Sequence, residues 1–190
     1  MKSIRAAFSY CFLIVLACNA LTAQTGTDKQ FTKDNLTFDY PTGWTLTDDS
    51  NGDAQQLTLA RANNDVQIRV FAHRGRVSVE KLPDAKKAFI DPYVLATAKQ
   101  FVAMGAKPQQ GPDSTDIAGT KAEGVVITAS LGGEPGAAKI YWALIGGRVV
   151  VLTYFGPDKE LKQFASAWDL IRNSIKIEDP KAAPKPSPKP

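Results

Sequence analysis

The side chains that most often carry out catalysis are scarce in this chain. Among its 190 residues there is one histidine, His73, and there are two cysteines, Cys11 and Cys18. Ser-His-Asp and Cys-His arrangements need a histidine beside the nucleophile. His73 ends a run of alternating apolar residues, and a histidine at a strand end more often has a structural role. We therefore predict that the chain has no catalytic residue.

One polar segment contains the residue types that bind calcium. Asp49, Asn51 and Asp53 alternate as the first ligands of a calcium loop do. However, Gly52 stands in the wrong position for such a loop, and Ala60 stands where the closing glutamate belongs. Asp, Asn and Gly also favour turns, because they form local hydrogen bonds and accept positive φ. We predict a turn here, no metal site and no cofactor.

Two glycine-rich segments have the composition of phosphate-binding loops without their context. They are Gly132–Gly136 and Gly146-Gly147. Neither is followed by the Lys-Ser/Thr pair of a phosphate loop, and neither connects a strand to a helix. We predict that both are hairpin turns.

The net charge of +4 belongs to the ends of the chain. Two of the basic residues lie near the N-terminus and three in the last ten residues, so residues 24 to 180 carry a net charge of −1. Nucleic-acid binding depends on clustered Lys and Arg, and we expect no nucleic-acid partner. Arg69, Arg74 and Arg76 form one local basic cluster, which we interpret as a solvated strand end.

The first 23 residues have the layout of a secretion signal. Basic residues precede an apolar run over 10–17, and small and polar residues follow it. The run is too short to span a membrane, which needs about 20 apolar residues. We predict that 1–23 is a signal peptide, cleaved after Ala20 or Ala23, and that the mature protein is periplasmic or secreted.

Cys18 leaves one alternative to this prediction. Val15-Leu16-Ala17-Cys18 resembles the cleavage box of bacterial lipoproteins, in which the cysteine carries the lipid. Leu16 is bulkier than the usual residue, so we favour export without a lipid, with anchoring through Cys18 as the alternative. Both cysteines precede the mature domain, which excludes an internal disulfide and a thiolate metal site there.

Alternating apolar and polar residues predict an antiparallel sheet. The predicted strands are 36–40, 44–46, 55–61, 66–73, 121–131, 139–145 and 148–155. The short connections leave no room for parallel crossovers. Residues 107–119, with two prolines and two glycines, are predicted to be a loop or a short edge element.

From Ser78 the apolar residues fit short helical turns that Pro83 and Pro92 should break. Periods of three and four residues then predict two longer helices. The first has Asp91 as N-cap, Pro92 as its first residue and Gly105 at its end. One face of this helix should consist of Leu95, Ala98, Phe101 and Val102. The second begins after 156–158, and its apolar face should consist of Leu161, Phe164, Ala165, Trp168, Ile171 and Ile175. We expect one shared core between the helices and a single sheet, containing Trp44, Leu95, Phe101, Phe164 and Trp168.

The order of these elements, with Tyr40-Pro41-Thr42-Gly43-Trp44 at the first corner and Ile171–Ile175 closing the last helix, resembles the PsbP-like superfamily. The resemblance covers 31–178 and implies an α+β fold, a twisted antiparallel sheet packed by helices as an α/β/α sandwich. We predict one domain over 31–178, a polar leader at 24–30 and a disordered Pro/Lys-rich tail at 179–190.

The same resemblance directs the functional expectation. Superfamily members with a known role act as binding or assembly factors, and no functional residue of theirs can be placed on this chain. We expect an exported, non-enzymatic binding or assembly factor with a protein or envelope partner. The alternative is a small secreted hydrolase or ligand-binding enzyme that uses carboxylates, which would need converging Asp or Glu side chains in a deep pocket.

Overall fold

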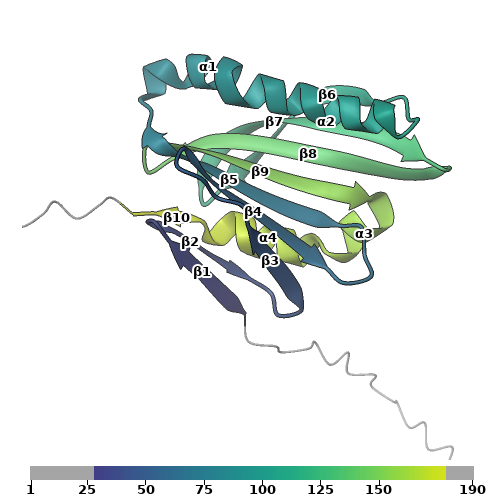
Figure 1. The fold of residues 1–190 in the computed structure, drawn as a ribbon, viewed down its shortest axis with the longest axis horizontal. Coiled ribbons are helices and arrows are strands. Elements are labelled where there is room, and N and C mark those ends of the chain that lie inside the picture. Colours follow the sequence, from purple (N-terminus) through teal and green to yellow (C-terminus); the bar gives the residue numbers. More distant parts are fainter. Residues whose placement is uncertain (1–27, 179–190) are drawn as a thin grey trace, which may run out of the picture.

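A computed structural model describes residues 28–178 and places most strands in one seven-stranded antiparallel sheet (Figure 1). Its strand order is β3-β4-β5-β9-β8-β7-β6. The strands are β3 (Trp44–Asp48), β4 (Ala54–Arg61), β5 (Gln67–Arg76), β6 (Gln109–Ile117), β7 (Thr120–Leu131), β8 (Glu134–Ile145) and β9 (Arg148–Pro157). The predicted signal with its two cysteines and the predicted tail lie outside the described residues.

A second, three-stranded sheet contains the opening strand. It consists of β1 (Lys29–Lys33), β2 (Leu36–Tyr40) and β10 (Lys176–Ile177), with β2 in the centre. The expectation of a single sheet is therefore wrong. The chain leaves the first sheet at the corner between β2 and β3, where Gly43 has a φ of +87°, a conformation that glycine adopts without steric cost. β1 also includes Lys29 and Gln30, so the predicted leader ends earlier than residue 30.

The predicted hairpins are confirmed. Gly146 and Gly147 have φ values of +54° and +74° between paired Ile145 and Arg148, as a tight two-residue hairpin turn requires. The other glycine-rich turn is shorter than predicted, because β8 already begins at Glu134. The segment 107–119, expected as a loop or a short edge element, contains the nine-residue strand β6 at the sheet edge, where a proline is tolerated.

The first helical region is continuous, so the predicted breaks at Pro83 and Pro92 are wrong. A 3₁₀ turn (Val79–Lys81), α1 (Leu82–Ala85), a π-helical segment (Lys86–Ile90) and α2 (Asp91–Ala103) follow one another without a break. Asp91 has helical φ and ψ of −60° and −43°, so the prediction that it is an N-cap is wrong. Pro83 and Pro92 each lie in the first turn of a segment, a position that proline tolerates.

The π-helical segment lies directly before Pro92. Proline has no N–H for the carbonyl four residues earlier, and its ring crowds that carbonyl. A wider π turn relieves this conflict without ending the helix. The helix therefore continues through Pro92, and the wider turn shifts the positions of its side chains around the helix axis.

Helix α2 ends as predicted, but its buried face differs. Gly105 has a φ of +85°, and the Ala106 N–H donates to the Phe101 carbonyl at 3.0 Å, which forms a Schellman cap. Leu95 and Val102 are 55% and 59% exposed. The buried face passes instead through Thr97, whose hydroxyl donates to the Tyr93 carbonyl and is thereby satisfied.

The second helical region is divided at Phe164. It comprises α3 (Asp158–Gln163) and α4 (Ala165–Ser174), and Phe164 between them has a φ of −106°. This break rotates α4 relative to α3, so Ala167 is buried and Ala165 is exposed, contrary to the prediction.

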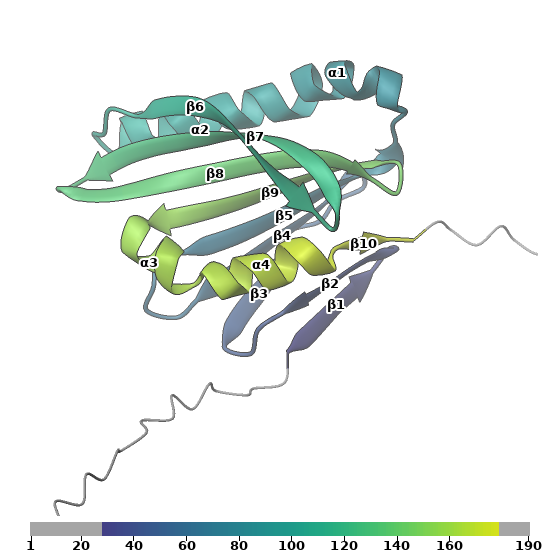
Figure 2. The ribbon, with the colours of Figure 1, turned by 180° about the vertical axis from the view of Figure 1, so that it is seen from behind.

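The helices cover opposite faces of the seven-stranded sheet (Figures 1 and 2). Trp44, Phe164 and Trp168 lie in the core on the α3 and α4 side, whereas Phe101 lies in a separate core under α2. The predicted shared core is thus wrong, since the sheet separates the two clusters and Leu95 is exposed. The α+β fold class and the packing of an antiparallel sheet between helices are confirmed. Among residues 28–178, no helix combines the length and apolar character needed to cross a bilayer.

Candidate functional site

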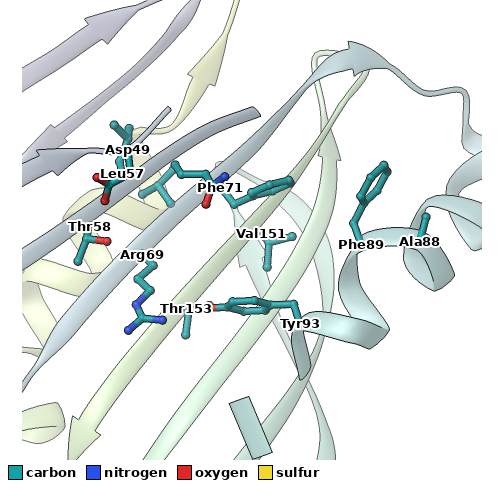
Figure 3. Close-up of a pocket in the computed structure, with 12 residues that line it drawn as sticks. Asp49, Leu57, Thr58, Arg69, Phe71, Ala88, Phe89, Tyr93, Val151 and Thr153 are labelled. Carbon is teal, nitrogen blue, oxygen red and sulfur yellow. The ribbon is translucent and has the colours of Figure 1, made fainter. Parts of the chain in front are cut away.

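A cleft of about 390 Å³ lies between the π-helical segment, the start of α2 and one face of the seven-stranded sheet (Figure 3). It exists because the core under the helix is built mainly from β7, β8 and β9. The same face of β4 and β5 is less covered, and the cleft opens there. Its size falls within the range of ligand pockets in proteins.

The register of three strands builds a polar row along the cleft. Thr58 on β4 pairs with Arg69 on β5, and Arg69 pairs with Thr153 on β9. Tyr93 reaches from the helix to this row, and its hydroxyl lies 3.0 Å from that of Thr153 (Figure 3). The row therefore contains two threonine hydroxyls, a phenol and a guanidinium, and the hydroxyls of Thr153 and Tyr93 are bonded to each other.

The next row towards the α1 end of the helix is mainly apolar. Gln56, Phe71 and Val151 pair across the same three strands. Ala88 and Phe89 from the π-helical segment line the cleft opposite them. The cleft is therefore amphipathic, with hydrogen-bonding groups in one row and rings and aliphatic groups in the other.

Arg69 is the one cationic side chain among the residues that line the cleft. One edge of its guanidinium already donates hydrogen bonds to Gln67. Its Nε and Nη2 lie 3.3 and 3.0 Å from the side-chain oxygen of Gln67. No ion pair joins Arg69 to an acidic residue within 28–178. Asp49 lines the cleft but is exposed. The site thus holds a fixed positive charge without a described counterion.

Two features singled out in the sequence, His73 and the arginine cluster, can be placed relative to this cleft. His73 is half-buried, stacks on Phe89 with ring centroids 4.8 Å apart, and has Nδ1 3.1 Å from the Gly75 carbonyl oxygen. The expected arginine cluster is divided, because Arg69 lies in the cleft whereas Arg74 pairs with Asp34 at 2.8 Å.

The polar segment around Asn51 forms the predicted turn. The Asn51 side-chain oxygen accepts the backbone N–H groups of Asp53 and Ala54, each at 2.9 Å. Asp48 accepts the Ser50 N–H at 3.0 Å. These side chains are engaged by their own backbone. Within the described part of the chain, no three His, Cys, Asp or Glu side chains are grouped as a metal site requires.

Another recess, of about 380 Å³, is lined by Arg148 and by residues of the β1–β2 turn. Arg148 is 6% exposed. Its guanidinium donates to the side-chain oxygen of Gln55 at 2.6 Å and to the carbonyls of Asp34, Ala72 and His73. Burial, followed by the nearby charge of Arg74, lowers its pKa. Because these bonds join the β1–β2 turn to β4, β5 and β9, we interpret Arg148 as a structural link between the two sheets.

Sequence reasoning missed the cleft residues Tyr93 and Thr153, and it interpreted Arg69 as part of a solvated strand end. The alternation of β5 placed Ile68 and Val70 inward and left Arg69 and Phe71 on a face assumed to be solvated. The alternation in β5 would have indicated Arg69 and Phe71 as cleft residues if it had been known that a helix packs on their face of the sheet. Only the fold places a helix there.

Comparison with known proteins finds solved structures with a similar fold, but no match at the level of sequence. No protein-family model and no curated protein matches the chain. The solution structure of cyanobacterial PsbP (CyanoP) from Synechocystis sp. PCC 6803 is similar with a TM-score of 0.50 and 15% identity, over 82% of this chain and 96% of that chain. A crystal structure from Bacteroides thetaiotaomicron VPI-5482 is similar with a TM-score of 0.54 and 10% identity, over 81% of this chain and 50% of that one. At these identities the similarity concerns the fold alone, and the chain has a PsbP-like fold.

Proposed function

We propose that this protein is an exported, non-enzymatic binding factor whose cleft between α2 and the sheet holds a small, largely apolar ligand. The observation that carries this proposal is the cleft itself, with apolar groups of Phe71, Val151 and Phe89 beside a short polar row. Pockets that bind small molecules are mostly apolar, with a few well-placed polar groups.

The content of the cleft supports binding rather than catalysis. Its lining includes one carboxylate, Asp49, which is exposed. Hydrolysis by paired carboxylates needs two such groups facing one bond, as in glycosidases. The binding and assembly roles of PsbP-like superfamily members agree with this proposal, and a protein or envelope partner would then receive the ligand or sense it.

A neutral fluorescent probe, N-phenyl-1-naphthylamine, tests the cleft. We expect its emission to rise on binding to the wild-type protein, because the ring would leave water for apolar surroundings. Ala88→Trp should weaken binding about tenfold or more, since the indole would fill the space between the helix and the sheet. Ala88 is exposed and lines the cleft, so this change should not disturb the core.

Ala96→Trp is the matched control. Ala96 is an exposed residue of the same helix and does not line the cleft. The control variant should bind the probe as the wild type does. Absence of probe binding, or equal affinity in both tryptophan variants, would contradict the proposed cleft.

Export is tested at the N-terminus of the protein made in a bacterial host. We expect mass spectrometry of the envelope or medium fraction to find a chain that begins after Ala20 or Ala23, because small residues precede signal-peptidase sites. A diacylated Cys18 would replace this prediction with lipid anchoring, and an intact Met1 in the cytoplasm would contradict export.

A further inference from the structure

The open edge of Arg69 indicates what kind of polar group the cleft receives. A guanidinium has two edges that can each donate a pair of parallel hydrogen bonds. Gln67 occupies the lateral edge through Nε and Nη2, which also restrains the side chain. No described residue accepts a hydrogen bond from Nη1. The end-on edge, Nη1 with Nη2, is therefore available to a ligand.

The surroundings of Arg69 favour an anion over a neutral acceptor. Arg69 is half-buried, and no carboxylate lies within ion-pair distance in the described chain. A partly desolvated cation gains more from a negative partner than one in bulk water does. Thr58 lies in the adjacent register position and can donate from its hydroxyl, whereas the Thr153 hydroxyl on the other side is already hydrogen-bonded to that of Tyr93. The Arg69 guanidinium and the Thr58 hydroxyl can thus both donate to a ligand in this part of the cleft.

The apolar row determines the body of the ligand. Phe71, Phe89 and Tyr93 present three rings to the cleft, with Val151 on the sheet between them. Aromatic side chains favour offset or edge contacts with another ring. The polar row and the apolar row are two residues apart along each strand, which is roughly 7 Å, so a short ligand can contact both.

From this geometry we propose that the ligand is a monocarboxylic acid with a flat, apolar body, whose carboxylate binds the end-on edge of Arg69. The inference rests on the proposed binding function of the cleft. The carboxylate accepts two parallel hydrogen bonds from the guanidinium, and the body lies over Phe71 and Val151. Asp49 at the rim disfavours a second negative charge on the ligand.

Isothermal titration calorimetry with a matched pair of probes tests this proposal. The probes are 4-phenylbutyrate and 4-phenylbutan-1-ol, which share the body and differ in the head group. We expect the wild type to bind the acid about tenfold to a hundredfold more tightly, because a charge-assisted bidentate pair replaces a neutral hydrogen bond. Arg69→Met should remove this preference, and Arg69→Lys should restore only part of it, since an ammonium cannot offer a planar fork.

A parallel titration with the neutral probe N-phenyl-1-naphthylamine separates failure of the proposed cleft from failure of the Arg69 assignment. If the neutral probe binds and Arg69→Met leaves the preference for the acid unchanged, the Arg69 assignment is wrong and the cleft stands. If the acid and the alcohol bind equally, the carboxylate is wrong. If phenylbutyl phosphate binds more tightly than the acid, the head group is a phosphate and the proposal fails as stated. If no probe binds, the proposed function fails first.

Discussion

Replacing Trp168 with alanine is expected to lower the free energy of unfolding by about 4 kcal/mol. Trp168 is 8% exposed and stacks on Tyr154, with ring centroids 5.2 Å apart and an interplanar angle of 5°. Tyr141 lies on it at 5.9 Å. The substitution removes an indole that contacts both tyrosine rings, and the loss of stability includes the free energy of its transfer from water and the cost of the cavity left behind.

Neither tyrosine can readily move to fill that cavity. The Tyr154 hydroxyl donates to the Leu161 carbonyl at 2.7 Å, and the Tyr141 hydroxyl donates to Asp113 at 2.7 Å. Burial raises the pKa of both phenols, so both remain protonated and bonded at neutral pH. Because the cost of a cavity grows with the volume that stays empty, we expect the upper part of the usual range.

Urea unfolding followed by circular dichroism measures the Trp168 effect. Fluorescence alone is unsuitable, since the variant lacks one of three tryptophans. Trp168→Phe keeps an aromatic ring beside the tyrosines and should lose clearly less stability. A loss below about 1 kcal/mol for Trp168→Ala would show that the core on this side of the sheet is not packed as described.

Replacing Arg148 with methionine is expected to cost about 3 kcal/mol of unfolding free energy. Methionine retains much of the apolar stem and removes every donor. The side-chain oxygen of Gln55, which is fully buried, then loses a partner at 2.6 Å. The carbonyl of His73 loses another at 2.6 Å. Buried acceptors without partners cost more than the net value of the bonds they had made.

A double variant separates this explanation from simple loss of packing. In the double variant Arg148→Met with Gln55→Leu, both partners of the hydrogen bond between Arg148 and Gln55 become apolar. The double variant should therefore lose less stability than the sum of the single variants. Arg69→Met is the matched control, because Arg69 has one neutral side-chain partner and is half-buried. It should cost about 1 kcal/mol or less. Equal losses at Arg69 and Arg148 would contradict the structural role of Arg148.

The fold class was predictable because it depends on local patterns. Alternation identified the hairpins, and the Gly146-Gly147 turn fixed the register of β8 and β9. The errors came where a local pattern allowed two answers. Leu95 and Thr97 each belong to a possible stripe on α2, and a hydropathy pattern favours leucine. The structure buries Thr97, and this burial costs little because the Thr97 hydroxyl donates a hydrogen bond to the Tyr93 carbonyl.

The second sheet and the continuous helix were also beyond local patterns. Whether β2 pairs with β3 or with β1 and β10 is decided by the direction of the chain after Gly43 and by pairing with residues more than 130 positions later. Asp91-Pro92 has the residues of a helix start, and only the preceding π turn shows that the helix passes through it.

By itself the sequence determined the α+β class, the strand and helix types, and the scarcity of histidine and cysteine, since each of these follows from residue type and short-range spacing. The tertiary structure alone decided that Arg69, Thr153 and Tyr93 meet. They come from two strands and a helix, and they lie together because cross-strand register and helix packing join residues up to 84 positions apart. A binding site depends on such long-range neighbours, and for this reason the cleft could be found only in the folded chain.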